Sequence, residues 1–218
     1  IFSLFSFKSF GHVDHYANLN YLEYDLFRNN KPIGYHKYEF KRDKENLSIK
    51  SEVSFKINKL GVDLYNYFAT SEENYKKGEF KSYLSKTKQN KKDRYVNINI
   101  DTTDGNLIID GSSYKGKANK EFIVGTWWNH EIVKAKAQIS GISGRIIEQT
   151  VTFIGKEEVK IEDKIFKTLH FKFKSSDETL PDSKKLDTDV WYEENTYLWV
   201  KASFDKSGHW EYRIKKYN

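Results

Sequence analysis

The chain contains no cysteine and only two prolines among its 218 residues. The absence of cysteine excludes disulfides, thiolate nucleophiles, cysteine-ligated zinc and iron–sulfur clusters. It does not fix the compartment, because a cysteine-free protein is stable on either side of a membrane. No apolar run approaches the roughly 20 residues that a transmembrane helix needs. The sequence therefore predicts no transmembrane segment.

The net charge of the chain is also small. The 37 basic residues outnumber the 31 acidic ones by six, and the two kinds are interspersed without a long block of one sign. This pattern is typical of a solvated surface, so we predict no nucleic-acid partner and leave a peripheral contact with the anionic lipids of the envelope open. Aromatic residues, in contrast, make up 16% of the chain, with 15 Tyr, 15 Phe and 5 Trp. Tyr and Trp combine a large apolar body with a polar group, which suits a half-wet sheet or a wide cavity.

The clearest structural signal is the alternation over residues 47–57, which read LSIKSEVSFKI. Apolar side chains occupy every second position, and polar ones lie between them. Only Ser51 interrupts the apolar row. Because successive side chains of a strand point to opposite faces, this segment is predicted to be a strand with one dry and one wet face.

Similar alternation recurs along most of the chain, separated by short turns such as Asn29–Pro32 and Asp104–Asn106. The pattern predicts about a dozen strands in all. It lacks the strand–helix alternation that is typical of parallel α/β folds. So large an antiparallel sheet must curl, split or close. We predict an all-β fold, mainly antiparallel, as a curled sheet or open barrel, with a sandwich left open.

One segment departs from this pattern. Trp128, Ile132, Ala135 and Ile139 are separated by four, three and four residues, and glycine follows at 141. Such spacing is helical. We predict one short helix near 128–139.

The N-terminus is apolar. Ile1–Phe7 reads IFSLFSF, and Ser9 and Gly11 provide small residues at a possible cleavage site. This is typical of the end of a signal peptide. We therefore predict that residues 1–19 are a signal-peptide remnant and N-terminal extension, that residues 20–218 form a single β domain, and that the protein is periplasmic or secreted. The alternative is an N-terminal strand that packs on the domain.

Few residues form a constellation that could carry chemistry. His130 and Glu131 are adjacent, and Asp187 and Asp189 would face the same side of a strand. Each pattern is more typical of a structural or solvated role. We assign no catalytic residue, no metal site and no cofactor.

Several short motifs together resemble an uncharacterised family of exported bacterial proteins. They are YDLFRN at 24–29, IG at 33–34 with His36, SEV at 51–53 with FK at 55–56, YFATS at 67–71, TWWN at 126–129, DVWY at 189–192 and WVK at 199–201. The resemblance extends from about residue 21 to the C-terminus. Asn30 departs from it, because the family favours glycine there, and so does the long 175–185 loop. No established activity transfers. The resemblance implies a fold similar to the curled half-barrels of periplasmic lipoprotein carriers, in which a helix plugs an apolar concave face.

The leading functional interpretation is a periplasmic binding or carrier protein that holds a lipid, an acyl chain or another hydrophobic molecule. The predicted cavity-lining residues are Phe55, Phe68, Trp127, Trp128 and Phe171. Two alternatives stay open. A polysaccharide hydrolase or lyase of the envelope would use carboxylates such as Asp187 and Asp189, and a structural module would add strands to an envelope partner.

Overall fold

The computed structural model describes residues 16–60 and 62–218. The predicted signal-peptide remnant with its cleavage site after Gly11, and also His12 and His15, lie outside the described residues. The first half of the chain forms β1 (Tyr21–Arg28), β2 (Lys31–Asp43), β3 (Asn46–Lys59), β4 (Val62–Lys76), β5 (Glu79–Gln89), β6 (Lys92–Ile100), β7 (Leu107–Gly111) and β8 (Lys115–Ala118). The second half forms β9 (Ile123–Val124), η2 (His130–Lys134), β10 (Ala137–Ile139), β11 (Ile146–Ile161), β12 (Lys164–Ser175), β13 (Asp187–Glu193), β14 (Trp199–Asp205) and β15 (His209–Tyr217).

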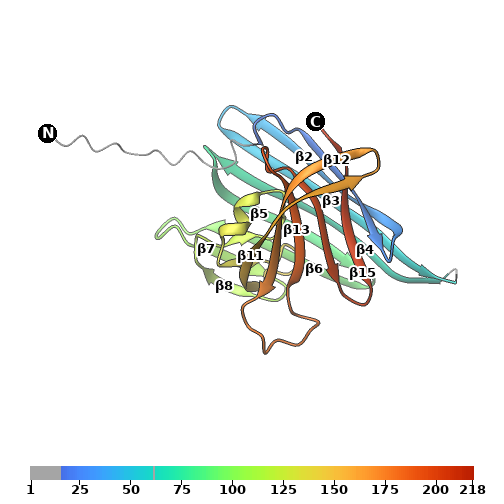
Figure 1. The fold of residues 1–218 in the computed structure, drawn as a ribbon. Coiled ribbons are helices and arrows are strands. Elements are labelled where there is room, and N and C mark those ends of the chain that lie inside the picture. The colour runs from blue at the N-terminus through green and yellow to red at the C-terminus, as the bar shows by residue number, and fades with distance from the viewer. Residues whose placement is uncertain (1–15, 61) are drawn as a thin grey trace.

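The described strands form one sheet in the order 8-7-6-5-4-3-2-1-15-14-13-12-11-10-9. All neighbouring pairs are antiparallel except β9 and β10, which run parallel. Two meanders thus meet where β1 pairs with β15, which brings the two ends of the folded chain together. Figure 1 shows the sheet strongly curved, with the β3–β4 hairpin projecting from one end. The all-β, mainly antiparallel and barrel-like fold predicted from the sequence is confirmed.

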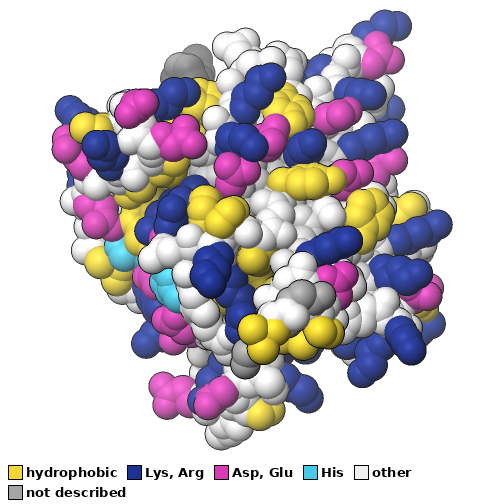
Figure 2. Space-filling view, turned by 90° about the vertical axis from the view of Figure 1, so that its right-hand side faces the viewer, with side chains coloured by type: hydrophobic (Ala, Val, Ile, Leu, Met, Phe, Trp, Pro, Cys, Tyr) yellow, Lys and Arg dark blue, Asp and Glu magenta, His cyan; other side chains and the backbone are white. Residues whose placement is uncertain are grey.

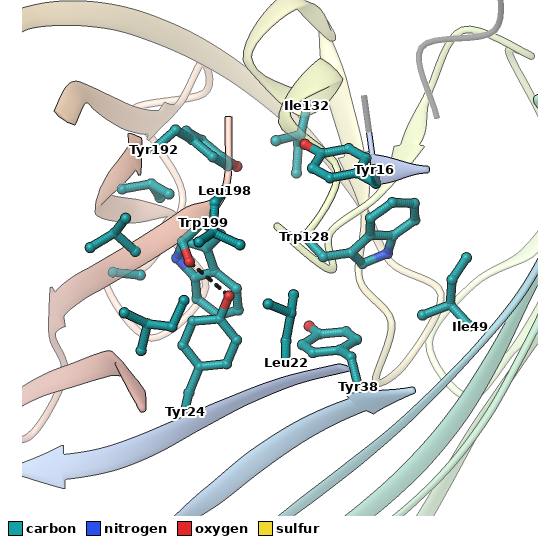
Figure 3. Packing of buried hydrophobic residues seen from close by; sticks show 14 of the residues in the cluster. Tyr16, Leu22, Tyr24, Tyr38, Ile49, Trp128, Ile132, Tyr192, Leu198 and Trp199 are labelled. Atoms are coloured by element: carbon teal, nitrogen blue, oxygen red, sulfur yellow. Dashed lines mark hydrogen bonds between the residues drawn. The ribbon is translucent and has the colours of Figure 1, made fainter. Parts of the chain in front are cut away.

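The structure also confirms the strand predicted over residues 47–57, which lies within β3. Leu47, Ile49 and Phe55 are buried in the concave face, and this face of β3 continues across the sheet into β2 and β4. The curl lets the concave face pack on itself and on the segment after β8. Trp128 and Ile132 lie in this core beside Tyr16, Leu22 and Trp199 (Figure 3).

The predicted helix is shorter than expected and of a different kind. His130–Lys134 forms a single 3₁₀ turn capped by Asn129, and Ala137–Ile139 is strand β10 instead of helix. All three residues of β10 are buried. Ile132 lies in the 3₁₀ turn and Ile139 in β10, so these residues do not share one helical face. Their spacing resembles that of a helix only because the turn and the strand are both packed against the core. Within the described residues no helix is long and apolar enough to cross a membrane.

Tyr16 is the first residue that the structure describes. Its side chain is 3% exposed and packs edge-on against Trp128, with ring centroids 5.4 Å apart. Its hydroxyl lies 2.8 Å from Nδ1 of His130. The end of the predicted N-terminal extension is thus part of the core.

Candidate functional site

A row of small side chains crosses the concave face. Ser51 of β3 lies opposite Ser71 of β4, and Ser71 lies opposite Ser85 of β5. In the next row Ala69 lies between Val53 and Thr87. Large side chains at these positions would fill the curl. Because they are small, they leave a hollow in the middle of the face.

This hollow, which we call the inner cavity, has a volume of about 280 Å³. It is lined by residues from β2 to β5, from the 125–147 segment and from β14 and β15. The lining residues are His36, Tyr38, Ser51, Val53, Tyr67, Ala69, Thr70, Ser71, Tyr83, Ser85, Thr87, Gly125, Thr126, Trp127, Gln138, Ser140, Gly141, Ile142, Ile147, Trp199, Phe204 and Tyr212. None of them is Lys, Arg, Asp or Glu.

The 125–141 segment approaches β5 closely at Gly141, where a Cβ would lie 2.5 Å from the Tyr83 hydroxyl. Within the segment, a Cβ on Gly125 would lie 2.2 Å from Oε1 of Gln138. The Gly141 carbonyl accepts hydrogen bonds from the Tyr83 and Ser85 hydroxyls. Glycine thus lets this segment cover part of the cavity.

Of two adjacent tryptophans, Trp127 faces the inner cavity and Trp128 lies in the core. Trp127 has φ 57°, a left-handed conformation that is unusual for a large side chain. Tyr38 donates a 2.6 Å hydrogen bond to the Thr126 carbonyl, and Tyr192 donates a 2.9 Å bond to the Trp127 carbonyl. These buried tyrosines hold the turn, so that the Trp127 ring meets the cavity. Strained backbone of this kind is often found at binding sites.

The aromatic wall of the cavity is built around Trp199. The Trp127 ring meets Trp199 edge-on, with centroids 5.6 Å apart, and Tyr24 stacks on Trp199 at 4.1 Å. Figure 3 shows the bond from the Tyr24 hydroxyl to the Trp199 carbonyl, which is 2.8 Å long. Tyr212 lies against both tryptophans. The wall is therefore rigid and offers ring faces and edges to a ligand.

His36 completes this wall. Its ring lies 4.2 Å from that of Tyr38, and burial lowers its pKa to about 3, so the imidazole is neutral near neutral pH. Within the described residues, neither ring nitrogen of His36 has a hydrogen-bond partner, and the same is true of Nε1 of Trp127 and of Trp199. Buried polar groups are nearly always paired. Their concentration around one cavity is a feature that packing alone does not explain.

The five predicted lining residues fall in different places. Trp127 lines the inner cavity, whereas Trp128 is 1% exposed in the core and donates a 2.9 Å bond from Nε1 to Glu73. Phe55 stacks on Tyr67 at 4.7 Å, one ring away from the cavity.

Phe171 and Phe68 lie further from the cavity. Phe171 is half-buried at the edge of the core beside Phe153, and Phe68 is 46% exposed on the outer face. The prediction placed Phe68 on the wrong face of β4, because Tyr67 and Ala69 are its inward-facing neighbours.

The predicted carboxylate pair lies outside the inner cavity. Asp187 and Asp189 both form ion pairs with Lys172, and Asp189 lies 2.8 Å from Nε2 of His170. Nδ1 of His170 in turn lies 3.0 Å from Glu157. This is a structural ion-pair network on the outer side of β11–β13. His130 is buried and lies 3.2 Å from Glu131, which is half-buried and also pairs with the exposed Lys134.

A second, wider groove of about 1030 Å³ lies at the rim beyond β4–β7. Phe80, Leu107 and Phe122 contribute apolar surface, but Lys77, Lys81, Lys120, Glu79, Glu121 and Glu131 also line it. Its charged border is that of a solvated surface groove. No group of three or more acidic or histidine side chains suited to a metal ion occurs in residues 16–60 and 62–218. The inner cavity is therefore the stronger candidate site.

Comparison with known proteins agrees with the architecture. A family model described as domain of unknown function (DUF6134) matches residues 24–215. Among solved structures, the chain is similar to a beta-barrel-like protein of domain of unknown function DUF1849 from Brucella abortus, with 12% identity and a TM-score of 0.62. The match covers 92% of this chain and 97% of that one. At this identity the likeness shows the fold alone. The search of curated proteins found no match.

Proposed function

The chain belongs to the DUF6134 family of domains of unknown function, and from that premise we propose that it is a binding protein holding an uncharged, largely apolar small molecule in the inner cavity. The observation that carries this proposal is the lining: aromatic rings and small hydroxyl side chains, with no charged residue among them. Concave, mainly apolar pockets with a few oriented polar groups are typical small-molecule sites.

The size of the cavity bounds the ligand. Small-molecule pockets commonly measure about 300–1,000 Å³, and the inner cavity, at about 280 Å³, lies at the lower end. This favours a compact ring compound or one acyl chain of a lipid over several chains at once. A carboxylate or phosphate inside the cavity would meet no cation, so an ionic head group would stay outside.

The polar groups suggest how such a ligand is oriented. The indole N–H groups of Trp127 and Trp199 are donors without partners among the described residues. A carbonyl, ether or hydroxyl oxygen on the ligand would be a suitable acceptor for such a donor. A ligand with one such oxygen and an apolar body fits the lining better than a pure hydrocarbon.

Export is part of the same proposal. Its support is the apolar sequence of residues 1–7 followed by small residues at 9 and 11. A periplasmic or secreted carrier would hold its hydrophobic ligand out of contact with water. N-terminal sequencing of the protein isolated from its own envelope fraction tests this point, and a mature N-terminus at residue 1 or earlier contradicts cleavage after Gly11.

The binding proposal is tested by native mass spectrometry of the purified protein, followed by titration with uncharged probes. We expect 1-aminoanthracene to quench tryptophan emission saturably with one site per chain. Filling the cavity by Ser71→Leu is expected to abolish this binding. Ser54→Leu, on the outward side of β3, is the matched control and keeps it. Binding that survives Ser71→Leu contradicts the assignment of the cavity.

A further inference from the structure

The projecting β3–β4 hairpin carries apolar side chains on its outer face. Val62 is 60% exposed, Leu64 54% and Phe68 46%, and Leu60 at the turn is 95% exposed. Val62, Leu64 and Phe68 share the outward parity of β4, with the polar Asn66 between Leu64 and Phe68, and Figure 1 shows this hairpin extending beyond the rest of the sheet. Single exposed apolar residues need no explanation, but a contiguous set marks an interaction surface.

Lysines surround these side chains. Lys88 lies directly opposite Phe68 on β5, and Lys56 lies opposite Asn66 on the neighbouring strand. Lys86 follows on the same face of β5, Lys91 lies in the turn after β5, and Lys92 begins β6 at a position paired with the inward-facing row of Gln89 and Tyr67. All five are exposed, and within residues 16–60 and 62–218 none of them forms an ion pair.

The balance of charge at this end is positive. Asp63 and Asp93 are also exposed, and Asp93 lies directly opposite Lys88. The half-buried Glu52 lies across Thr70 from Lys86, so five lysines stand against three carboxylates. Figure 2 faces this end of the molecule and shows hydrophobic side chains interspersed with both basic and acidic ones. We define the hairpin face as Lys56, Val62, Leu64, Phe68 and Lys88.

We propose that the hairpin face docks on a lipid bilayer that contains anionic phospholipids. Such a surface presents phosphates to the lysines and an apolar interior to the exposed side chains of β4, which matches both halves of the face. A nucleic acid would pair with the lysines but would leave Val62 and Leu64 in water. This docking is independent of the cavity, since the hairpin face points away from it.

The test is co-flotation of the full chain with vesicles. We expect binding to vesicles of phosphatidylglycerol and phosphatidylethanolamine, and at least about tenfold weaker binding to phosphatidylcholine alone. Leu64→Ser with Phe68→Ser is expected to weaken binding to the anionic vesicles by about tenfold or more, and Lys56→Glu with Lys88→Glu by a similar factor that shrinks as salt rises. Because these side chains are exposed, the variants are expected to keep wild-type circular dichroism and cavity binding.

Ile165→Ser with Lys167→Glu is the matched control. These residues give β12 an exposed apolar side chain and an exposed lysine far along the chain from the hairpin. We expect its vesicle binding to stay within about twofold of wild type. Equal loss in this control, unchanged binding in both hairpin variants, or binding to a single-stranded oligonucleotide without binding to vesicles would each overturn the proposal. None of these outcomes bears on the inner cavity.

Discussion

Ser51 and Ser71 stand opposite each other on β3 and β4, with their hydroxyl oxygens 2.8 Å apart at the floor of the inner cavity. Ser51 is the residue that interrupts the apolar row of β3. One hydroxyl donates to the other, so neither oxygen lies on this face without a hydrogen-bond partner. The cavity thus depends on the small volume of these two side chains.

Replacing Ser71 by Leu therefore separates binding from folding. The leucine side chain is expected to occupy the hollow and remove probe binding. Stability is expected to change by no more than about 1 kcal/mol, since the lost hydrogen bond and the added apolar burial offset each other. Fluorescence titration and urea unfolding measure the two effects. A large loss of stability in Ser71→Leu would indicate that the hollow is narrower than the structure shows.

His36 gives the fold a specific sensitivity to acid. Burial lowers its pKa from 6.5 to about 3, so the folded state favours the neutral ring. This contribution to stability is fully present above about pH 6.5 and is lost as the pH falls toward 3, at up to about 1.4 kcal/mol per pH unit. His36→Phe keeps a ring of similar size without the titration. We expect its stability to fall less than that of wild type between about pH 6.5 and 4.5.

The control for this experiment is His209→Phe, which changes an exposed histidine on β15. It is expected to retain the full acid sensitivity of the wild type. Urea unfolding at several pH values measures each slope. Parallel stability curves for His36→Phe and wild type would show that His36 is protonated without unfolding, and would contradict its burial as a neutral ring.

Much of the fold was predictable because alternation reports directly on burial. Leu47, Ile49 and Phe55 were placed on the dry face of β3, and the structure buries all three. Phe68 was misplaced because β4 carries aromatic residues on both faces, and the register shifts at Ile57 and Asn58. Side-chain type alone does not reveal which face of such a strand turns inward.

The site was less predictable, since it depends on pairing between strands. The interruption at Ser51 was visible in the sequence, but its meaning required Ser71 and Ser85 to lie beside it. Trp127 and Trp128 were both predicted to line a cavity. The positive φ of Trp127 explains why the two neighbours separate, and a tryptophan gives no sequence signal of that backbone conformation.

Glu73 ties the 126–128 segment to the sheet. Its buried carboxylate accepts a 2.9 Å bond from Nε1 of Trp128 and another from the Tyr75 hydroxyl. Glu73→Gln puts a donor where an acceptor is needed, and we expect it to cost about 1–3 kcal/mol of stability. Glu72→Gln, on the outward side of the same strand, is the control and is expected to cost little. Urea unfolding measures both.

The hydrogen bond from Trp128 to Glu73 also predicts that the stability losses of variants at these two positions are not additive. Trp128→Phe removes the indole donor, so its cost and that of Glu73→Gln should partly overlap in the double variant. A double variant whose loss equals the sum of the single losses would mean that the bond from Trp128 to Glu73 contributes nothing.

Asp189 belongs to the ion-pair network with Lys172 and His170 on the outer side of β11–β13. If this network is structural, replacing Asp189 should change the stability of the fold and nothing else. Partial burial raises its pKa, but hydrogen bonds from Lys172 and His170 outweigh this and hold the pKa below its ordinary value. The ionised form is thus stabilising above about pH 4, and this is lost as the pH falls. We expect Asp189→Asn to cost about 1 kcal/mol or less near neutral pH, and less still at high salt, because the network is partly exposed. Activity on a polysaccharide that disappears in Asp189→Asn without loss of stability would instead favour a hydrolase.

Trp127 offers the sharpest test of the site, because it joins an unpaired donor to a ring that faces the cavity. Trp127→Ala removes both, and we expect the affinity for an uncharged carbonyl-bearing probe to fall by about tenfold or more. Trp127→Phe keeps a ring but no N–H, so it should recover binding of a hydrocarbon probe better than that of the carbonyl probe. Phe68→Ala, on the outer face, is expected to leave both affinities unchanged. Titration by isothermal calorimetry avoids dependence on tryptophan emission, and equal losses for the two probes in Trp127→Phe would show that its indole N–H makes no bond to the ligand.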